Sequence, residues 1–441
     1  MKGILVLVAS FMLLASLVVF GAGAKEKEAA QPKEKVTITF AAWEHEEAVN
    51  VIEEVVNKIL QKDNPHITFE YMRVPKDYDT KVSTMIAGGT PPDLLFVWWN
   101  KTVMWTENGA LLPLDDLYNN DKNRPFNLED MVPALVETYS YKGKLMAVPD
   151  LAFPWLFYFN KDEFDTAGIA YPDDDWTWQD QFMIAAKKMT RDVDGDKKTD
   201  FYGYTMGYGF NRLHNFVLGN GGNYVSPDGK TAIVDRPETY EALQFIADLI
   251  HKHGVLPTPE QRAGQNRQMF FSAGRAAMFY SGYFYFQRVK DTTKARWGVG
   301  PLPKGKAGRA QFHEGEGVGI VKSSKHHQDA WEVAKLFAHP EYIKALVNMQ
   351  YSFGPLKEIS VPGSDLNNYF YSVQDVLTKE EAKTLLDAMN NQTYMPQFAQ
   401  AGKVQRALSE QIFSKIVSGD VSMKEATAAA VEELNALLQG E

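Results

Sequence analysis

In the first part of the chain, segments whose apolar residues recur every second position alternate with a segment whose apolar residues recur at helical spacing. This pattern limits the possible folds more than any other feature of the sequence. From Val36 to Ala42 apolar and polar residues alternate, which predicts a strand. Glu46–Lys62 then carries apolar residues at helical spacing, and Pro65 lies just past its end. Residues 67–71 (ITFEY) alternate again. A strand, a helix and a second strand in this order predict a parallel pair within an α/β sheet.

The same pattern continues along the chain. Leu94–Trp99 is a continuous apolar run, typical of a strand buried on both faces. Further strands are expected at residues 156–160 and 276–281, and helices at residues 179–190, 240–253, 331–337 and 423–438. With 441 residues, of which 45% are hydrophobic, the chain is too long for one compact core, so we expect two domains.

The N-terminus has the features of an export signal. Met1 and Lys2 are followed by the apolar run Ile4–Phe20, which ends in the small residues of 22–24 (AGA). We therefore expect residues 1–24 to be a cleaved signal peptide and residues 25–35 to be a charged linker. A retained membrane anchor is the less favoured alternative, because the run is short for a spanning helix.

Composition excludes several classes of function. The chain has no cysteine, which rules out disulfides, Cys-ligated zinc and a thioether lipid anchor, so we expect a periplasmic protein without a lipid anchor. A net charge of −10 does not suit nucleic-acid binding. Residues 300–307 nearly spell a phosphate loop, but Ala307 replaces the required Ser or Thr. The sequence contains neither a G-x-S-x-G elbow nor an HExxH pair.

Five stretches, in order, resemble the solute-binding proteins of carbohydrate ABC importers, the group that includes maltose-binding protein. Among them are YKGKLMAVPDLAFPWLFYFNKDEFDTAGI and FSAGRAAMFYSGYFYF; each stretch alone is weak, and the five in order carry the resemblance. The stretches are residues 63–97, 141–169, 171–190, 271–286 and 297–341. The resemblance implies an α/β, two-lobed periplasmic-binding-protein fold, each lobe a mainly parallel sheet flanked by helices, with a ligand cleft between the lobes.

The resemblance also implies lobe boundaries and a function. The N-terminal lobe would comprise residues 36–152 and 304–353, and the C-terminal lobe residues 153–303 and 354–441. Crossings between the lobes are expected near 150–154, 300–304 and 353–357. Such a protein captures a sugar or oligosaccharide by lobe closure and delivers it to the permease subunits of an ABC importer. It acts as a monomer, without a cofactor and without catalysis.

Two other functions stay open. A secreted glycoside hydrolase needs two carboxylates, and Glu44, Asp150, Glu314 and Glu316 are available, although no local motif pairs them. A binding protein for a phosphorylated polyol would need converging basic groups. Lys101 and Arg212 are too few to favour it.

Candidate ligand contacts of the first lobe follow two predicted strands, at the same edge of the sheet. Because strand side chains alternate, one of Trp98 and Trp99 should face the core and the other the cleft, where an indole can stack on a sugar ring. Glu44 could accept hydrogen bonds from sugar hydroxyls or simply favour a helix N-terminus. An aspartate at position 93 is expected to hold structure rather than ligand. The candidates, partly carried over from the resemblance, are Trp43, Glu44, His45, Trp99, Asn100 and Lys101.

Further candidates come from three segments, of which the first two lie in the expected C-terminal lobe. A glycine-punctuated loop, GYGFNRLHNF, mixes aromatic and hydrogen-bonding side chains. Two tyrosines follow Gly282, where relatives carry a G-P-W-like aromatic; this chain lacks both Pro and Trp there. Two acids stand in what we interpret as a glycine-rich turn, either to read hydroxyls or as solvated charges. The candidates are Tyr208, Phe210, Asn211, Arg212, His214, Tyr283, Tyr285, His313 and Glu314, with Glu316 beside them. Trp99 and Tyr283 are expected to sandwich a sugar ring.

An Asp-rich segment has the spacing of a calcium loop, with candidate ligands Asp192, Asp194, Asp196 and Asp200. Lys197 replaces the glycine at the sixth position, and Gly203 replaces the glutamate at the twelfth. A solvated turn is therefore favoured, with calcium as the alternative.

Overall fold

The computed structural model describes residues 33–440 except 45, 313, 394–397 and 399. The predicted signal peptide, residues 1–24, lies outside the described residues, as does most of the predicted linker. Within the described part of the chain, no helix is both long enough and apolar enough to span a bilayer.

The first sheet has five strands in the order β2-β1-β3-β12-β6. β1 (Val36–Ala42) pairs parallel with β2 (Ile67–Arg73) and with β3 (Leu94–Trp98). β12 (Glu314–Ile320) runs antiparallel between β3 and β6 (Val148–Phe153). The predicted strand-helix-strand unit is therefore confirmed.

The second sheet has the order β10-β7-β9-β8 and is mixed. β8 (Tyr202–Thr205) and β9 (Ala276–Gly282) pair parallel, but β7 (Trp155–Asn160) is antiparallel to both β9 and β10 (Trp297–Gly300). The expectation of a mainly parallel sheet in each lobe is wrong here. β7 follows β6 of the first sheet directly along the chain and runs opposite to both of its neighbours in the second sheet.

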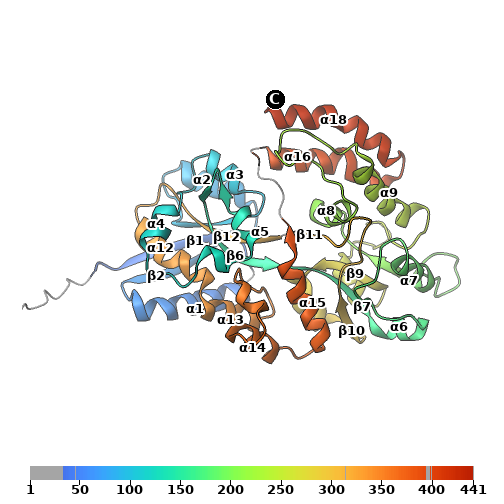
Figure 1. Ribbon diagram of the computed structural model, residues 1–441, viewed down its shortest axis with the longest axis horizontal. Helices are drawn as coiled ribbons and strands as arrows, with labels where there is room; N and C mark the ends of the chain where they lie inside the picture. The colour runs from blue at the N-terminus through green and yellow to red at the C-terminus, as the bar shows by residue number, and fades with distance from the viewer. Residues whose placement is uncertain (1–32, 45, 313, 394–397, 399, 441) are drawn as a thin grey trace, which may run out of the picture. The chain divides into compact units, whose positions relative to one another are not determined.

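Helices surround both sheets, and two short strand pairs complete the fold. Figure 1 shows α1 and α13 beside the first sheet, and α16 and α18 beside α9. The short pairs are β4 (Ser140–Tyr141) with β5 (Lys144–Leu145) and β11 (Gln311–Phe312) with β13 (Gln392–Thr393). The α-helices are α1 (Glu46–Asp63), α2 (Tyr78–Ala87), α3 (Thr102–Glu107), α4 (Asp115–Asn120), α5 (Pro133–Thr138), α6 (Lys161–Ala167), α7 (Gln181–Met189), α8 (Phe210–Gly219), α9 (Pro237–His251), α10 (Arg267–Ser272), α11 (Phe286–Thr292), α12 (His327–Ala334), α13 (Pro340–Asn348), α14 (Asp365–Ser372), α15 (Lys379–Asn390), α16 (Ala401–Ala407), α17 (Ser414–Ser418) and α18 (Met423–Gln439). Short 3₁₀ turns are η1 (Leu128–Asp130), η2 (Tyr283–Tyr285), η3 (Lys335–Ala338) and η4 (Lys357–Ser360), and η5 (Leu408–Phe413) is a π-helical turn.

The chain passes between the two sheets more than once. The first passage is at Pro154, between β6 and β7, within the predicted crossing at 150–154. The second passage was expected near 300–304, but Lys304 still forms a β-bridge with Thr177 beside the second sheet. The chain returns to the first sheet only after β11, where β12 begins. The third follows α14, which packs on α13, whereas α15 packs on β7 and β10. The lobe boundaries themselves stay a proposal.

Asp93 ties three separate segments of the first sheet together, as predicted for a structural residue. Its Oδ2 accepts hydrogen bonds from the backbone N of Thr39 at 3.0 Å and from Thr39 Oγ1 at 3.1 Å. Its Oδ1 accepts one from Ser324 Oγ at 2.6 Å. Asp93 thus connects β1, the start of β3 and the segment that follows β12.

We predict that Asp93→Ala destabilises the protein, because it leaves three largely buried donors without their acceptor. The free energy of unfolding should fall by about 2–4 kcal/mol. Urea denaturation measures the loss, with Glu54→Ala on the exposed face of α1 as the control, which should stay within about 0.5 kcal/mol of the parent. Equal midpoints for the two variants would contradict the prediction.

Candidate functional site

A cavity of about 610 Å³ lies where β1 and β3 end and faces α8 and α16. We call it the tryptophan cavity. Five residues predicted from the sequence line it: Trp43, Trp99, Asn100, Lys101 and Asn211. Its remaining lining residues are Asp77, Tyr78, Asp79, Thr80, Trp98 and Gln405. The predicted edge of the first sheet is therefore where the structure has an open space.

Both adjacent tryptophans line the tryptophan cavity, but they differ in exposure. Trp99 is 3% exposed and packs on Phe210 at 5.8 Å between ring centroids and on Phe312 at 4.8 Å. Trp98 is half-buried and lies 5.2 Å from the ring of Trp43. Trp98 therefore offers the more accessible indole face, whereas the sequence named Trp99 as the candidate and left open which of the two faces the cleft.

Polar groups at the tryptophan cavity are partly unsatisfied. Asn100 Nδ2 donates to Gln405 Oε1 at 2.7 Å, which joins the turn after β3 to α16. Three buried atoms have no hydrogen-bond partner among the described residues: Asn100 Oδ1, Gln405 Nε2 and Trp99 Nε1. Lys101 forms an ion pair with Asp79 at 2.6 Å. Unpaired buried donors and acceptors are unfavourable, so a ligand with hydroxyl groups would find partners here.

Four carboxylates are buried beside this region: Glu44, Asp150, Glu314 and Glu316 are each 6% exposed or less. Glu44 accepts a hydrogen bond from the hydroxyl of Tyr351, and burial raises its pKa to about 7. Burial, with the negative charges of Glu44, Asp150 and Glu314, also raises the pKa of Glu316. Carboxyl groups that keep their protons can donate hydrogen bonds as well as accept them.

The sequence predicted that the segment GYGFNRLHNF is a loop. The structure differs, because helix α8 begins at Phe210, within this segment. The helix carries Asn211 toward the first sheet, where Asn211 Nδ2 donates to Glu314 Oε1 at 2.5 Å. His214 turns inward and is 1% exposed between the rings of Phe210 and Tyr224. Burial lowers the pKa of His214 to about 3, so it is neutral and belongs to the core.

The predicted sandwich of Trp99 and Tyr283 does not form. Tyr283 is 1% exposed, with its ring 4.3 Å from that of Phe353 and 4.9 Å from that of Phe286. It lies in a different core cluster from Trp99. The turn that follows β9 folds its first tyrosine inward, which the sequence pattern did not indicate.

The other two predicted tyrosines contact arginines instead. The guanidinium of Arg267 lies 4.9 Å from the ring centre of Tyr285, and that of Arg262 lies 5.8 Å from the ring centre of Tyr208. The hydroxyl of Tyr208 donates to the carbonyl oxygen of Pro257 at 2.6 Å.

Two predicted contacts, His45 and His313, lie outside the described residues. The sequence was interpreted to place the acids that follow His313 in a glycine-rich turn, but they lie in β12, an interior strand of the first sheet. Its alternating glycines allow close packing: a side chain at Gly317 would meet the ring of Tyr139 at 2.9 Å. Glycines next to acids indicated a turn, but here they allow neighbouring side chains to pack closely against a strand.

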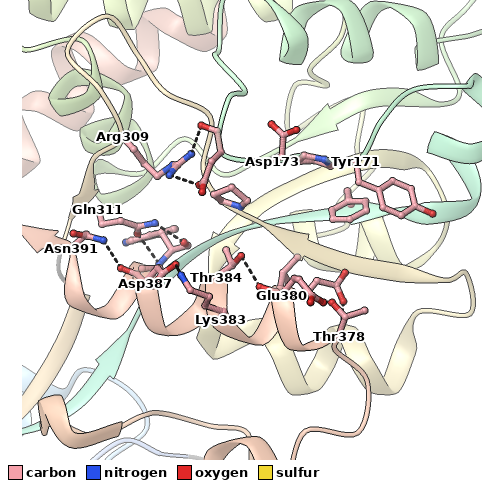
Figure 2. A pocket seen from close by; sticks show the side chains of 18 of the residues that line it. Tyr171, Asp173, Arg309, Gln311, Thr378, Glu380, Lys383, Thr384, Asp387 and Asn391 are labelled. Atoms are coloured by element: carbon pink, nitrogen blue, oxygen red, sulfur yellow. Dashed lines mark hydrogen bonds and ion pairs between the residues drawn. The ribbon is translucent and has the colours of Figure 1, made fainter. Parts of the chain in front are cut away.

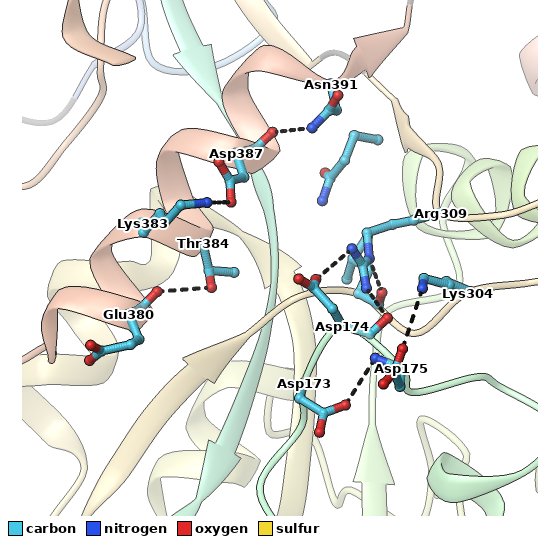
Figure 3. Close-up of polar contacts among 12 residues, drawn as sticks. Asp173, Asp174, Asp175, Lys304, Arg309, Glu380, Lys383, Thr384, Asp387 and Asn391 are labelled. Atoms are coloured by element: carbon cyan, nitrogen blue, oxygen red, sulfur yellow. Dashed lines mark hydrogen bonds and ion pairs between the residues drawn. The ribbon is translucent and has the colours of Figure 1, made fainter. Parts of the chain in front are cut away.

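A larger cavity, of about 770 Å³, contains none of the predicted contacts. It lies between α15 and the segments around Asp173 and Arg309, and we call it the α15 groove (Figure 2). Its charged groups already pair with one another (Figure 3): Arg309 with Asp174 at 2.9 Å, and Lys383 with Asp387 at 2.5 Å. Tyr171 supplies an exposed aromatic ring at one end. The α15 groove therefore offers fewer unsatisfied groups to a ligand than the tryptophan cavity.

The Asp-rich segment does bring its four carboxylates together, with ligand atoms within 4.8 Å of one another. The turn is also held by its own backbone. Asp192 accepts from the N–H groups of Gly195 and Lys197, and Asp200 accepts from that of Val193. The predicted calcium ligands are thus close together in an exposed turn that hydrogen bonds already stabilise.

The sequence patterns did not identify several polar residues that lie near the site. Gln405 comes from a helix near the C-terminus, and Arg262 and Arg267 come from a segment without any recognisable motif. Tyr351, which hydrogen-bonds Glu44, was also missed. No local pattern signals these residues, because they reach the site only through folding.

Comparison with solved structures defines the class of fold: a two-lobed α/β protein. An ABC substrate-binding protein from Listeria monocytogenes, in complex with cycloalternan, superposes with a TM-score of 0.79 at 23% identity, covering 92% of this chain and 100% of that one. Maltose-bound T. maritima MalE3 gives 0.73 at 21% identity, covering 91% and 99%. At these identities the likeness establishes the fold, and the predicted fold class is confirmed.

The chain belongs to the bacterial extracellular solute-binding protein family, whose model matches residues 24–344. A binding protein of Brucella abortus (strain 2308) is 25% identical over 293 residues, or 64% of this chain and 66% of that protein. The sn-glycerol-3-phosphate-binding periplasmic protein UgpB of Escherichia coli (strain K12) is 26% identical over 249 residues, or 53% and 54%. The chain thus spans just under two thirds of the first relative and about half of the second.

We predict that Glu44 makes stability depend on pH. Its pKa is raised from 4.5 to about 7, so between these values the folded protein binds more protons than the unfolded chain. The free energy of unfolding should therefore fall as pH rises through this window. Glu44→Gln cannot ionise, so its stability relative to the parent should rise by on the order of 3 kcal/mol between about pH 4 and pH 8.

Urea denaturation across that pH range measures this difference. Glu54→Gln, on the exposed face of α1, is the matched control for the loss of one acidic charge. A difference between Glu44→Gln and the parent that does not change with pH would show that folding does not raise the pKa of Glu44.

Proposed function

We propose that this protein captures a sugar or oligosaccharide in the tryptophan cavity and delivers it to the permease of an ABC importer. It does so in the periplasm, as a monomer, after removal of the signal peptide, and without chemical change to the ligand. The observation that carries the proposal is the tryptophan cavity itself. Aromatic rings and unpaired hydrogen-bonding groups line it, contributed by the turns after β1 and β3 and by α8 and α16. Sugar recognition needs this combination of groups.

Relatives support a carbohydrate ligand. The L. monocytogenes protein was solved with cycloalternan, the T. maritima protein with maltose, and another, from Arthrobacter globiformis, is a cyclic α-maltosyl-1,6-maltose-binding protein (TM-score 0.75, 21% identity, covering 92% of this chain and 100% of that one). Contacts such as Asn100 with Gln405 and Asn211 with Glu314 join segments beside the two sheets, so ligand binding and lobe closure would be coupled.

A phosphorylated polyol is the second candidate ligand. The likeness to the sn-glycerol-3-phosphate-binding protein favours it, and so do arginines that the sequence reading did not include. A glycoside hydrolase is not favoured, because the family is one of binding proteins.

Small-angle scattering combined with calorimetry tests the proposal. Titration with maltose, maltotriose and a cyclic maltooligosaccharide should give a binding heat for at least one of them. The radius of gyration should decrease at saturation, and chromatography should recover the ligand unchanged. Binding without any change in radius would exclude closure, and released product would reveal an enzyme.

We predict that Trp98→Ala weakens the binding of every accepted sugar to a similar extent, since each pyranose presents an apolar face. The loss of one stacking surface should reduce affinity by about 1–3 kcal/mol. Tyr171→Ala removes a partly exposed ring from the α15 groove and should leave the affinity unchanged. If calorimetry gives the opposite result, the ligand binds in the α15 groove and not in the tryptophan cavity.

A further inference from the structure

Three arginines gather around residues 206–212, just before and at the start of α8. Arg212 follows the cavity residue Asn211 on α8, and its guanidinium lies 5.3 Å from the ring centre of Trp155. Arg267 and Arg262 come from the segment before β9. We call Arg212, Arg262 and Arg267 the arginine group.

Gly207 shows how close two of these side chains are. A Cβ atom built on Gly207 would lie 3.2 Å from Nη1 of Arg267 and 3.3 Å from Cδ of Arg212. The missing side chain therefore lets both arginines pack against the same stretch of backbone. Burial and the positive charge of Arg212 lower the pKa of Arg267 to about 10, with Arg262 adding to the effect, so the three charges act on one another.

The positive charge of the arginine group is only partly balanced. The Nε atoms of all three arginines are buried and have no hydrogen-bond partner among the described residues. Arg262 is 8% exposed, and its Nη1 makes a long contact of 3.4 Å to the carbonyl oxygen of Met206. Glu314 is the carboxylate whose charge acts on Arg212 and Arg267, and one of its oxygens already accepts from Asn211.

The start of α8 adds to this positive potential. Its N-cap is Gly209, which has no side chain to accept from the first N–H groups of a helix of ten residues. A helix N-terminus attracts negative charge, and guanidinium groups bind carboxylate and phosphate oxygens in pairs. Both features point to an anion. On the first sheet, next to Trp43 and Trp98 of the cavity, lie instead the buried carboxyl groups of Glu44 and Glu316, whose pKa is raised and which suit hydroxyl groups.

We propose that the arginine group is an anion-binding subsite, and that the ligand is a hydroxylated molecule with one anionic group, either a sugar acid or a phosphorylated polyol. This inference rests on the proposed function, since it assumes that the ligand occupies the tryptophan cavity. The anionic group contacts Arg212, Arg262 and Arg267, while the hydroxyl groups contact the side of the first sheet.

The subsite is tested first without a sugar. Inorganic phosphate at about 20 mM should raise the Tm of the full protein by about 2 °C more than chloride at equal ionic strength. The double variant R262Q/R267Q should lose this difference. R275Q is the matched control and should respond like the parent. Arg275 lies over Phe270 at the start of β9, whereas Arg267 lies over Tyr285, which follows the end of that strand. Equal Tm values in phosphate and chloride for the parent would overturn the subsite.

The ligand class is tested with matched sugars by calorimetry. D-glucuronate or D-glucose 6-phosphate should bind at least about tenfold more tightly than D-glucose, and the better of the two identifies the anionic group. R262Q/R267Q should reduce that ratio to about twofold or less, whereas R267K, which keeps the charge, should retain part of it.

The two proposals can fail separately. If neutral sugars bind as tightly as anionic ones and the double variant leaves the ratio unchanged, the inference is overturned while the proposed function stands. If phosphate stabilises the protein through the arginine group but no sugar binds, the proposed function fails and the anion subsite stands.

Discussion

The insertion of β12 between β3 and β6 is the constraint on which the rest of the structure depends. The chain returns from the second sheet into this strand, whose hydrogen bonds to β3 and β6 complete the first sheet. Its glycines allow the ring of Tyr139 to pack directly on the strand. The same strand carries Glu314 and Glu316 into the buried region beside the tryptophan cavity.

Placing acids on a central strand has an electrostatic consequence. Glu316 joins Glu44 and Asp150 in a buried region, where burial and mutual repulsion favour the protonated forms. Glu314 instead lies near Arg212 and Arg267, whose charges oppose the effect of burial. The two sides of the site therefore differ in chemistry: one suits hydroxyl groups and the other a negative charge. A ligand carrying both kinds of group would satisfy both sides.

The sequence predicted the elements of the first sheet well, because their signals are local. The alternation of residues 36–42 and 67–71 and the helical spacing between them specify β1, α1 and β2 directly. The positions that follow β1 and β3 were also predicted as the site edge, because parallel strands present their carboxyl ends together. Four of the predicted contacts line the tryptophan cavity as a result: Trp43, Trp99, Asn100 and Lys101.

Tertiary structure alone decided which side chains face that cavity. Tyr283 and His214 have the chemistry of ligand contacts but lie in the cores, because the turn after β9 and the helix α8 direct them inward. Gln405, Arg262 and Arg267 reach the site from distant segments that carry no motif. By itself, the sequence determined the strands, the helices and the family resemblance, since periodicity and motifs are properties of neighbouring residues. Burial and long-range contact are properties of the whole fold, so only the tertiary structure decided the site.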